Sequence, residues 1–508
     1  MRERRYYEIG ENASASFRNH VNYCIGTGRM GLALQKEYMN QLALVQEEIG
    51  FQYIRGHGLF TDDMAIFQVY EEDGARRIEY NFTYLDLVMD NYRSCGLRPF
   101  LELGFMPAAM ASGEQTIFYW KGNTTPPADY GEWCGLVTAT LSHLMERYGA
   151  DEVTGWPVEV WNEPNLPGFW KDADMQEYFR LFEETFRAVK KLDSRFRVGG
   201  PAICGVRDEF WIRSFMEFCR DRKLPVDFVT RHHYTTDFPE NAGHYGYAEL
   251  SDPQAGFANL QSTRDIIDSF EEYRGLPIHI TEFNTSYIPN CPLHDTNQNA
   301  AYIAQQLSRL GDVNESYSYW TFGDIFEEKG VPFTPFHGGF GLVANGNIPK
   351  PTFWTFKFFR DLSGTCVHRS DELVVLKKED GSYCGVAWNQ SRTRTGRELE
   401  FALSLAAGQE EYFLLVKTVD EETCNPLKLW HDMGEPSSLT AAQKKLLQES
   451  ARPSVSSARV CAEDKTAELG LRVKEHGVVY FELNPSKLQP DRGYAYDRVM
   501  QYSGGGAE

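Results

Sequence analysis

Two glutamates follow apolar stretches of the chain and could form a catalytic carboxyl pair if the fold brings them together. Glu163 lies in "VEVWNEPN", where apolar and aromatic residues stop on Asn-Glu-Pro, and Glu282 lies in "PIHITEFN". Such a pair cleaves a glycosidic bond when one carboxylate attacks the anomeric carbon and the other, protonated, donates to the departing oxygen. Carboxyls about 5–5.5 Å apart give retention of configuration, and about 6.5–9.5 Å gives inversion. An isolated Asn-Glu-Pro is commonly only a solvated strand end, so the inference depends on the rest of the chain.

The acid of such a pair must keep its proton near neutral pH. A neighbouring anionic carboxylate raises the pKa of the acid, because two like charges at this distance repel each other. Once the nucleophile is consumed in a covalent glycosyl-enzyme, the repulsion disappears and the same residue becomes a base for water. Glu163 and Glu282 are far apart in the sequence, so the fold has to bring them together.

Short stretches of β-forming residues alternate with helical patterns over most of the chain. The eight stretches are 19–26, 51–58, 98–105, 158–163, 197–203, 226–234, 277–284 and 316–322. Between them apolar residues recur every three or four positions, as at Tyr178, Phe182, Phe186 and Val189, which is typical of amphipathic helices. Eight parallel strands with helical crossovers can close, so the pattern predicts an α/β fold, a (β/α)8 TIM barrel over residues 14–363. The alternative is a doubly wound open sheet, but no Gly-rich phosphate turn follows the first strand.

The predicted strands end on side chains that could do chemistry. In a barrel of this kind the loops after the strand carboxyl ends build the active site. Besides the two glutamates, these ends carry His57, Glu102, Asn162, His232, Tyr234 and Trp320, with Glu327 and Glu328 shortly after. A purely structural distribution would place such residues equally often on helices and at the other end of the barrel. His233 should point away from its neighbours, because side chains alternate along a strand, and it is not expected to function.

The pattern of predicted elements changes after about residue 363. Stretches such as "ELVVLKKEDGSYCGVAWN" and "LGLRVKEHGVVYFELN" are strands joined by turns rather than by helices. They predict an accessory C-terminal antiparallel β-sandwich over residues 364–485, to which residues 1–13 could add a strand. A Ser-capped helix is expected within 434–452, and residues 486–508 are expected to form a tail with a frayed Gly-rich end.

Composition limits the partners of the chain. The formal charge of −21 disfavours nucleic acids and anionic membranes, which need a basic surface. No apolar stretch reaches the length of a membrane span, and the N-terminus lacks a signal-peptide core, so a cytoplasmic protein is expected. The ten cysteines are scattered without metal-ligand spacing and are expected to be reduced thiols. No metal site is expected, and a metal-dependent barrel enzyme is disfavoured because the strand ends lack a His/Asp ligand set.

Longer motifs place the chain near a known family. It resembles glycoside hydrolase family 39, in particular its bacterial β-xylosidases, within clan A of the barrel glycosidases. The likeness runs from about residue 10 to residue 484 and includes "YIRGHG", "RPFLELGFMP", "FYWKGN", "WNEPNLPGFWKDAD", "DFVTRHHYT", "ITEFNTSY", "SYWTFGDIFEE" and "FHGGFGLVA". This combination is far more specific than Asn-Glu-Pro, which many clan members share.

The resemblance implies a role for each matched residue. Glu163 would be the general acid/base and Glu282 the nucleophile. Asn162 would donate to the 2-hydroxyl of the sugar, and Tyr234 would hold the nucleophile in place. The other implied contacts to the sugar come from His57, His232, Phe118 as a wall, Trp320 as a platform, and Glu327 or Glu328 for distal hydroxyls.

The activity that the resemblance implies is a retaining exo-glycosidase. It would release β-D-xylose from the non-reducing end of xylo-oligosaccharides by double displacement, with no cofactor, in a homo-oligomer for which a tetramer is one candidate. Alternatives are another clan β-glycosidase, an arabinopyranosidase, and an α-L-iduronidase-like enzyme, whose anionic substrate Arg55 could bind. The iduronidases are lysosomal, however, and this chain lacks a signal peptide. A non-catalytic sugar-binding relative is disfavoured because both carboxylates stand in intact motifs.

Overall fold

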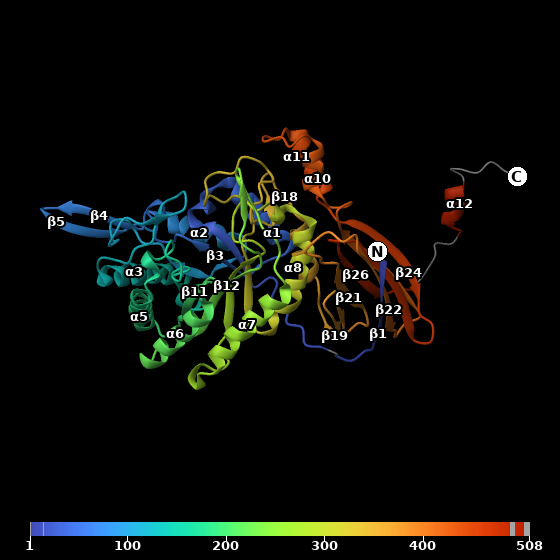
Figure 1. Cartoon of the computed structure of the whole chain (residues 1–508), viewed down its shortest axis with the longest axis horizontal. Coiled ribbons are helices and arrows are strands. Elements are labelled where there is room, and N and C mark those ends of the chain that lie inside the picture. The colour runs from blue at the N-terminus through green and yellow to red at the C-terminus, as the bar shows by residue number, and fades with distance from the viewer. Residues whose placement is uncertain (1, 14, 488–492, 502–508) are drawn as a thin grey trace.

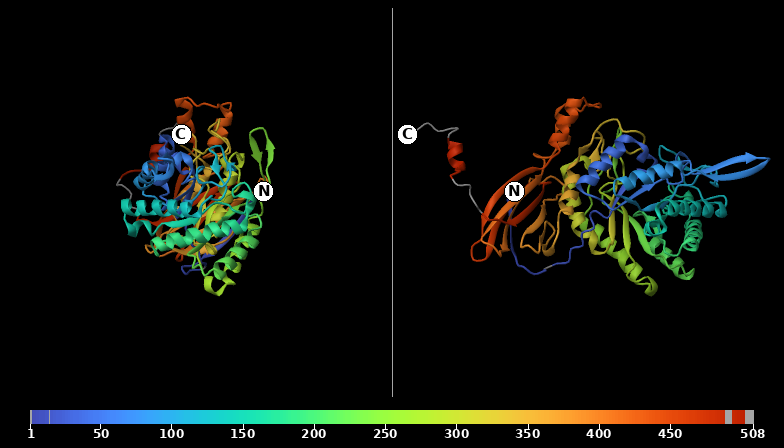
Figure 2. Two further views of the ribbon diagram at one scale, coloured as in Figure 1. Left: turned by 90° about the vertical axis from the view of Figure 1, so that its left-hand side faces the viewer. Right: turned by 180° about the vertical axis from the view of Figure 1, so that it is seen from behind.

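The computed structural model describes residues 2–13, 15–487 and 493–501 of the chain. A barrel wrapped in helices lies beside a β-sandwich, and a pair of helices projects where the two meet (Figures 1 and 2). No helix in the described part of the chain is long and apolar enough to cross a membrane.

Parallel strands close into the barrel. The order in the sheet is β6-β3-β2-β16-β15-β12-β11-β10-β7. β6 and β7 are halves of one strand interrupted at Phe100, and they pair with β3 and β10 respectively, so the sheet closes. The predicted eight-stranded barrel is therefore confirmed. Its strands are β2 (Cys24–Arg29), β3 (Tyr53–His57), β6 (Arg98–Pro99) with β7 (Leu101–Leu103), β10 (Pro157–Val160), β11 (Arg197–Ile203), β12 (Phe228–Tyr234), β15 (Ile278–Asn284) and β16 (Ser316–Tyr319).

The first strand differs from the expected range 19–26. Residues up to Tyr23 form a turn, in which the Tyr23 amide donates to the His20 carbonyl, and β2 continues through Gly26 and Gly28 to Arg29. Glycines disfavour strands in sequence patterns, which hid this part of β2. Gly26 is required by the fold, because a Cβ there would lie 2.5 Å from the Trp320 ring.

Helices cover the outside of the barrel. In α5, Asp174 caps the first turn by accepting from the Gln176 and Glu177 amides. The predicted stripe of Tyr178, Phe182, Phe186 and Val189 is buried against the sheet, which confirms the helical period. The helices are α1 (Lys36–Glu48), α2 (Thr83–Ser94), α3 (Tyr130–Tyr148), the short α4 (Ala150–Val153), α5 (Met175–Leu192), α6 (Asp208–Asp221), α7 (Pro253–Asp268), α8 (Asn297–Arg309) and α9 (Pro351–Arg360).

Several loops contain short β-hairpins. The longest, β4 (Phe67–Glu72) with β5 (Ala75–Tyr80), extends from the end of the molecule farthest from the sandwich (Figure 1). Its turn residues Asp73 and Gly74 both have positive φ, as a tight hairpin turn requires. The others are β8 (Thr116–Ile117) with β9 (Gly122–Asn123), β13 (Glu240–Ala242) with β14 (Tyr245–Tyr247), and β17 (Val343–Ala344) with β18 (Ile348–Pro349).

The C-terminal region contains two sheets. The larger is antiparallel, with the order β19 (Thr365–Arg369), β20 (Leu373–Lys377), β21 (Tyr383–Trp388), β26 (Val478–Pro485), β23 (Glu411–Val419) and β24 (Ser454–Cys461). The smaller has β22 (Glu398–Ala406) between β25 (Thr466–Val473) and the N-terminal β1 (Arg2–Ile9), which runs parallel to β22. Phe358 of α9 contacts Tyr480 of β26, with ring centroids 5.5 Å apart, and so joins the barrel to this region.

Two helices are inserted between β23 and β24. They are α10 (Pro426–Asp432) and α11 (Ala441–Ser450). Thr440, and not a serine, caps α11, in a capping box with Gln443 that places the start of the helix later than residue 434. The tail contributes α12 (Tyr496–Gln501), whereas the Gly-rich end that was expected to fray lies outside the described residues.

Candidate active site

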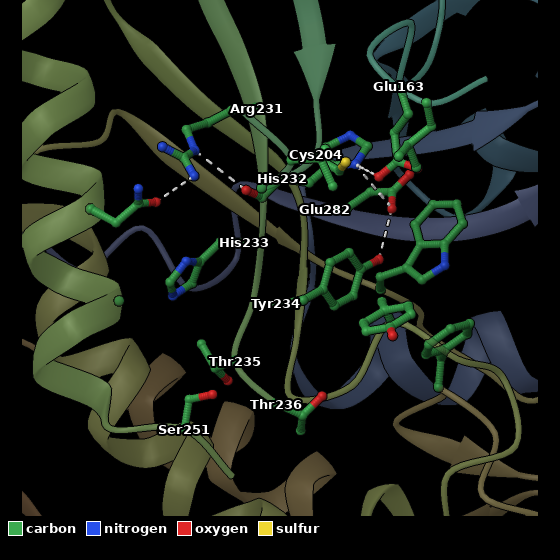
Figure 3. A pocket seen from close by; sticks show the side chains of 18 of the residues that line it. Glu163, Cys204, Arg231, His232, His233, Tyr234, Thr235, Thr236, Ser251 and Glu282 are labelled. Atoms are coloured by element: carbon green, nitrogen blue, oxygen red, sulfur yellow. Dashed lines mark hydrogen bonds and ion pairs between the residues drawn. The ribbon is translucent and has the colours of Figure 1, made fainter. Parts of the chain in front are cut away.

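A cavity of about 690 Å³ opens at the carboxyl ends of the barrel strands (Figure 3). Its wall includes eight of the ten side chains singled out from the sequence, which are His57, Asn162, Glu163, His232, Tyr234, Glu282, Trp320 and Glu328. The closure of the barrel therefore brings together residues from five of its strands or the loops that follow them.

Phe118 and Glu327 do not belong to this wall. Phe118 stacks against His57, with ring centroids 5.9 Å apart. Glu327 forms an ion pair with Arg29 at 2.7 Å. Of the two adjacent glutamates, Glu328 faces the cavity, with Oε1 3.9 Å from Nε2 of His57.

Glu163 is held by an unusual backbone. It follows β10 with φ 45°, and Trp161 has φ 72°, both in the left-handed region that non-glycine residues rarely adopt. The Glu163 amide donates to the Ala202 carbonyl at 2.9 Å, which stabilises this turn. The side chain is buried, and its Oε1 lies 2.8 Å from Nδ1 of His232.

Glu282 lies within β15 and accepts two hydrogen bonds. Arg55 donates to Oε1 at 2.8 Å, and the Tyr234 hydroxyl donates to Oε2 at 2.7 Å. The preceding Thr281 also reaches the barrel interior, where it donates to Glu159. Consecutive side chains share this side because the pairing of β15 with both neighbouring strands shifts register here.

The two candidate catalytic carboxyls are close together. A carboxylate oxygen of Glu163, one of Glu282 and a ring nitrogen of His232 all lie within 4.8 Å of one another. In the described part of the chain this trio is also the one His/Cys/Asp/Glu cluster compact enough for a metal ion. Glu282 already accepts from Arg55 and Tyr234, so the trio fits acid–base chemistry without a metal.

The surroundings assign the proton to Glu163. Burial raises the pKa of Glu163 well above its usual range, and the charge of Glu282 raises it further. Burial also keeps the pKa of Glu282 above its ordinary value, but Arg55, His57 and the Tyr234 hydrogen bond lower it, so it is raised less than that of Glu163. Glu282 therefore has the contacts that favour an anion, and Glu163 has those that favour a neutral acid.

A fully buried arginine connects the floor of the site. Arg55 donates to Glu159 at 2.6 Å, to Glu282 at 2.8 Å and to Oδ1 of Asn162 at 2.9 Å, and it lies 2.9 Å from Glu102. Burial lowers its pKa, but the charges of Glu159, Glu102 and Glu282 raise it above the ordinary value. The guanidinium is therefore a permanent cation beneath the nucleophile.

Sequence reasoning missed the part that Arg55 and Glu159 have in this network and gave Glu102 no role. Arg55 precedes His57 by two residues on β3, and side chains two apart on a strand share a face. That spacing was the available signal for Arg55. Glu159 lies in the interior of β10, where a carboxylate has no partner until the barrel closes.

Two nitrogen atoms of cavity-lining side chains have no hydrogen-bond partner among the residues that the structure describes. Because a guanidinium only donates, Oδ1 of Asn162 must face Arg55, and this leaves Nδ2 free. Nε2 of His232 also lacks a partner. Burial lowers the pKa of His57 to about 3, so its ring is neutral, with Nδ1 2.8 Å from Glu102. His233 points to the opposite side of β12 from His232 and Tyr234 (Figure 3), as expected, but its ring still borders the cavity. It lies 3.1 Å from Gln306.

Comparison with known proteins agrees with this geometry. The model for glycosyl hydrolases family 39 matches residues 9–467. The chain belongs to this family.

Individual family 39 relatives are similar over nearly the whole chain. A β-xylosidase of Geobacillus stearothermophilus is 47% identical over 94% of both chains. The crystal structure of a monomeric β-xylosidase from Caulobacter crescentus superposes with a TM-score of 0.86 and 34% identity, over 95% of this chain and 100% of that one. Human α-L-iduronidase is 32% identical, but over only 25% of this chain and 18% of its own. The chain is therefore a glycoside hydrolase of family 39.

Proposed function

We propose that this family 39 enzyme is a β-xylosidase that releases β-D-xylose from the non-reducing end of xylo-oligosaccharides with retention of configuration. The observation that carries the proposal is the pair of buried carboxyls, whose oxygens approach within 4.8 Å and of which Glu163 has its pKa raised the more strongly. This short spacing supports a retaining pair, because the carboxyls of an inverting enzyme stand wider apart to admit a water. The β-xylosidase relatives support xylose as the sugar.

In the first step Glu282 attacks the anomeric carbon. The bond from that carbon to the glycosidic oxygen breaks, and Glu163 gives its proton to the leaving alcohol. The product is a xylosyl ester of Glu282. Arg55 and Tyr234 hold the attacking carboxylate, and the free Nδ2 of Asn162 would donate to the 2-hydroxyl as positive charge develops on the ring.

In the second step the roles reverse. Glu282 is now a neutral ester, so it no longer raises the pKa of Glu163, which is left as a carboxylate. Glu163 takes a proton from water while the water oxygen attacks the anomeric carbon. The ester bond to Glu282 breaks, and xylose leaves with its original configuration.

An α-L-iduronide is a poorer substrate for this cavity than a neutral sugar. Its carboxylate would need an unoccupied cation, but Arg55 already contacts three glutamates. Arg231, the arginine in the cavity wall, is paired with Asp208 at 2.9 Å. Activity on α-L-arabinopyranosides or other β-glycosides, and a homo-oligomeric state, remain predictions.

The proposal is tested with 4-nitrophenyl glycosides, namely β-D-xyloside, α-L-arabinopyranoside, β-D-glucoside and α-L-iduronide. We expect the β-xyloside to react fastest and the Glu282→Ala variant to be inactive. Loss of Glu163 should reduce the rate on xylobiose about 10²–10⁴-fold. Added azide should restore turnover of Glu163→Ala on the aryl xyloside and give β-xylosyl azide. The control Glu327→Gln should retain activity, and a wild type that hydrolyses none of the four glycosides would refute the proposal.

A further inference from the structure

One part of the cavity wall has no task in the two-carboxylate mechanism. It consists of Val206, after β11, and of Thr236 and Phe238, after β12. The Phe238 side chain is 92% exposed and that of Val206 is 49% exposed. A phenylalanine so fully in water adds little to the stability of the fold, and at the cavity wall its ring is free to contact a bound molecule.

The strand order shows which part of a substrate meets this wall. Glu163 must stand beside the glycosidic oxygen, so the leaving sugar lies on its side of the cavity. In the sheet β10, which precedes Glu163, is followed by β11 and then β12. His57, on β3, and Trp320, after β16, lie on the opposite arc of the barrel, where they would enclose the xylose that is released.

The wall also has the chemistry that a pyranose requires. A xylose ring has flat C–H faces that stack on aromatic side chains, with hydroxyl groups around its edge. Phe238 offers such a face. Thr236 follows His232 and Tyr234 at the two-residue period, and its hydroxyl oxygen has no hydrogen-bond partner among the described residues. Figure 3 shows Thr236 beyond Tyr234 and Thr235, just after the end of β12.

We propose that Thr236 and Phe238 form the binding subsite for the leaving sugar, which is the second xylose of a xylo-oligosaccharide. Phe238 stacks on its ring and Thr236 hydrogen-bonds one of its hydroxyls. The inference rests on the proposed β-xylosidase activity and adds the residues that select an oligosaccharide over a simple xyloside.

The test compares xylobiose with methyl β-D-xyloside on the full-length enzyme. Both substrates need the same acid and nucleophile, but only xylobiose has a second sugar. For Phe238→Ala and for Thr236→Val we expect kcat/KM on xylobiose to fall about 3- to 10-fold, the size of one stacking or hydrogen-bonding contact. The value for methyl β-D-xyloside should stay within about twofold. The control Phe413→Ala, an exposed phenylalanine on β23, should change neither value.

Two results would overturn the subsite while leaving the β-xylosidase activity intact. One is an equal fall for both substrates, which would show a general effect on the barrel. The other is no change on xylobiose, and a simultaneous loss of oligomeric mass would then identify Phe238 as part of an interface between copies. If the wild type cleaves neither substrate, the proposed function fails as well, so the two failures are distinguishable.

Discussion

At the scale of single residues, the neighbours of Glu163 and Glu282 give these two glutamates different roles. Glu282 accepts hydrogen bonds from Arg55 and Tyr234, which favour its charged form. Glu163 lies beside His232 and near the charge of Glu282, and these surroundings favour its neutral form. Burial lowers the pKa of His232 well below its usual value, so this imidazole adds no positive charge beside Glu163. The division of labour between acid and nucleophile thus arises from where one arginine and one tyrosine are placed.

The pKa of Glu163 should therefore depend on the charge of Glu282. In Glu282→Gln the like charge is removed, so we expect the pKa of Glu163 to fall toward that of an ordinary glutamate. Carbon-13 NMR titration of side-chain-labelled glutamate would measure the change. The matched variant Glu327→Gln, whose carboxylate pairs with Arg29, should leave the Glu163 titration where it is. An unchanged pKa in Glu282→Gln would mean that burial alone sets it.

Residue types at strand ends could predict the catalytic pair but not its supports. Glu163 follows a strand and Glu282 lies near the end of one, and a carboxyl directly after an apolar stretch is easily noticed in the sequence. Arg55 and Glu159 lie inside strands, and a charged residue there resembles one that faces solvent. Only the closed barrel shows that the cation is surrounded by three carboxylates, because those come from β7, β10 and β15.

At the scale of elements, a buried lysine fixes the glycine-rich turn that carries Phe340. Lys350 lies 2.7 Å from Asp295, from Asp324 and from the Gly339 carbonyl, so all three of its donors are used. The two aspartates in turn accept from the amides of Gly338 and Gly341. Phe340, between these amides, lines the cavity.

Removing this lysine should loosen the turn. Lys350→Met leaves two buried aspartates without their cation, which costs about 3–5 kcal/mol for a buried pair that loses one partner. We expect a lower unfolding temperature by calorimetry and a lower kcat/KM, because Phe340 loses its anchor. Lys357→Met is the control, since its pair with Asp361 is a partly exposed helical one worth about 0.3–0.5 kcal/mol. Equal shifts of the unfolding temperature in both variants would contradict a stabilising role of Lys350 in this turn.

Elements were easier to predict than their boundaries. The alternation of strand and helix patterns predicts the barrel, because each strand must bury its apolar residues under a helix. Both bounds of β2 were wrong. The predicted range began too early, at residues that form a turn, and stopped at Gly26 because Gly28 lowers the strand signal beyond it. The β4–β5 hairpin was missed, because it stands outside the alternation and buries little.

At the scale of the whole molecule, the N-terminus is tied to the other end of the chain. β1 pairs with β22 in parallel from Arg2 to Ile9, so the first residues belong to the C-terminal sheets and the chain enters the barrel only afterwards (Figure 1). The barrel and these sheets meet through α9, where Phe359 contacts Trp388 and Phe358 contacts Tyr480. Stability of the C-terminal region should therefore depend on β1, whereas the cavity at the strand ends should not.

Two neighbouring tyrosines of β1 test this dependence. Tyr7 packs against His368 and Phe401, with ring centroids 4.3 and 6.3 Å away, while Tyr6 on the other face is 70% exposed. We expect Tyr7→Ala to destabilise the C-terminal sheets by about 1–2 kcal/mol and Tyr6→Ala to stay within about 0.5 kcal/mol of the wild type. Calorimetry would show a lower transition temperature for Tyr7→Ala alone. Freshly purified Tyr7→Ala should keep kcat/KM within about twofold, because no contact of Tyr7 reaches the barrel cavity. If both variants unfold at the wild-type temperature, the packing of Tyr7 does not contribute to the stability of the C-terminal sheets, and the prediction for β1 is wrong.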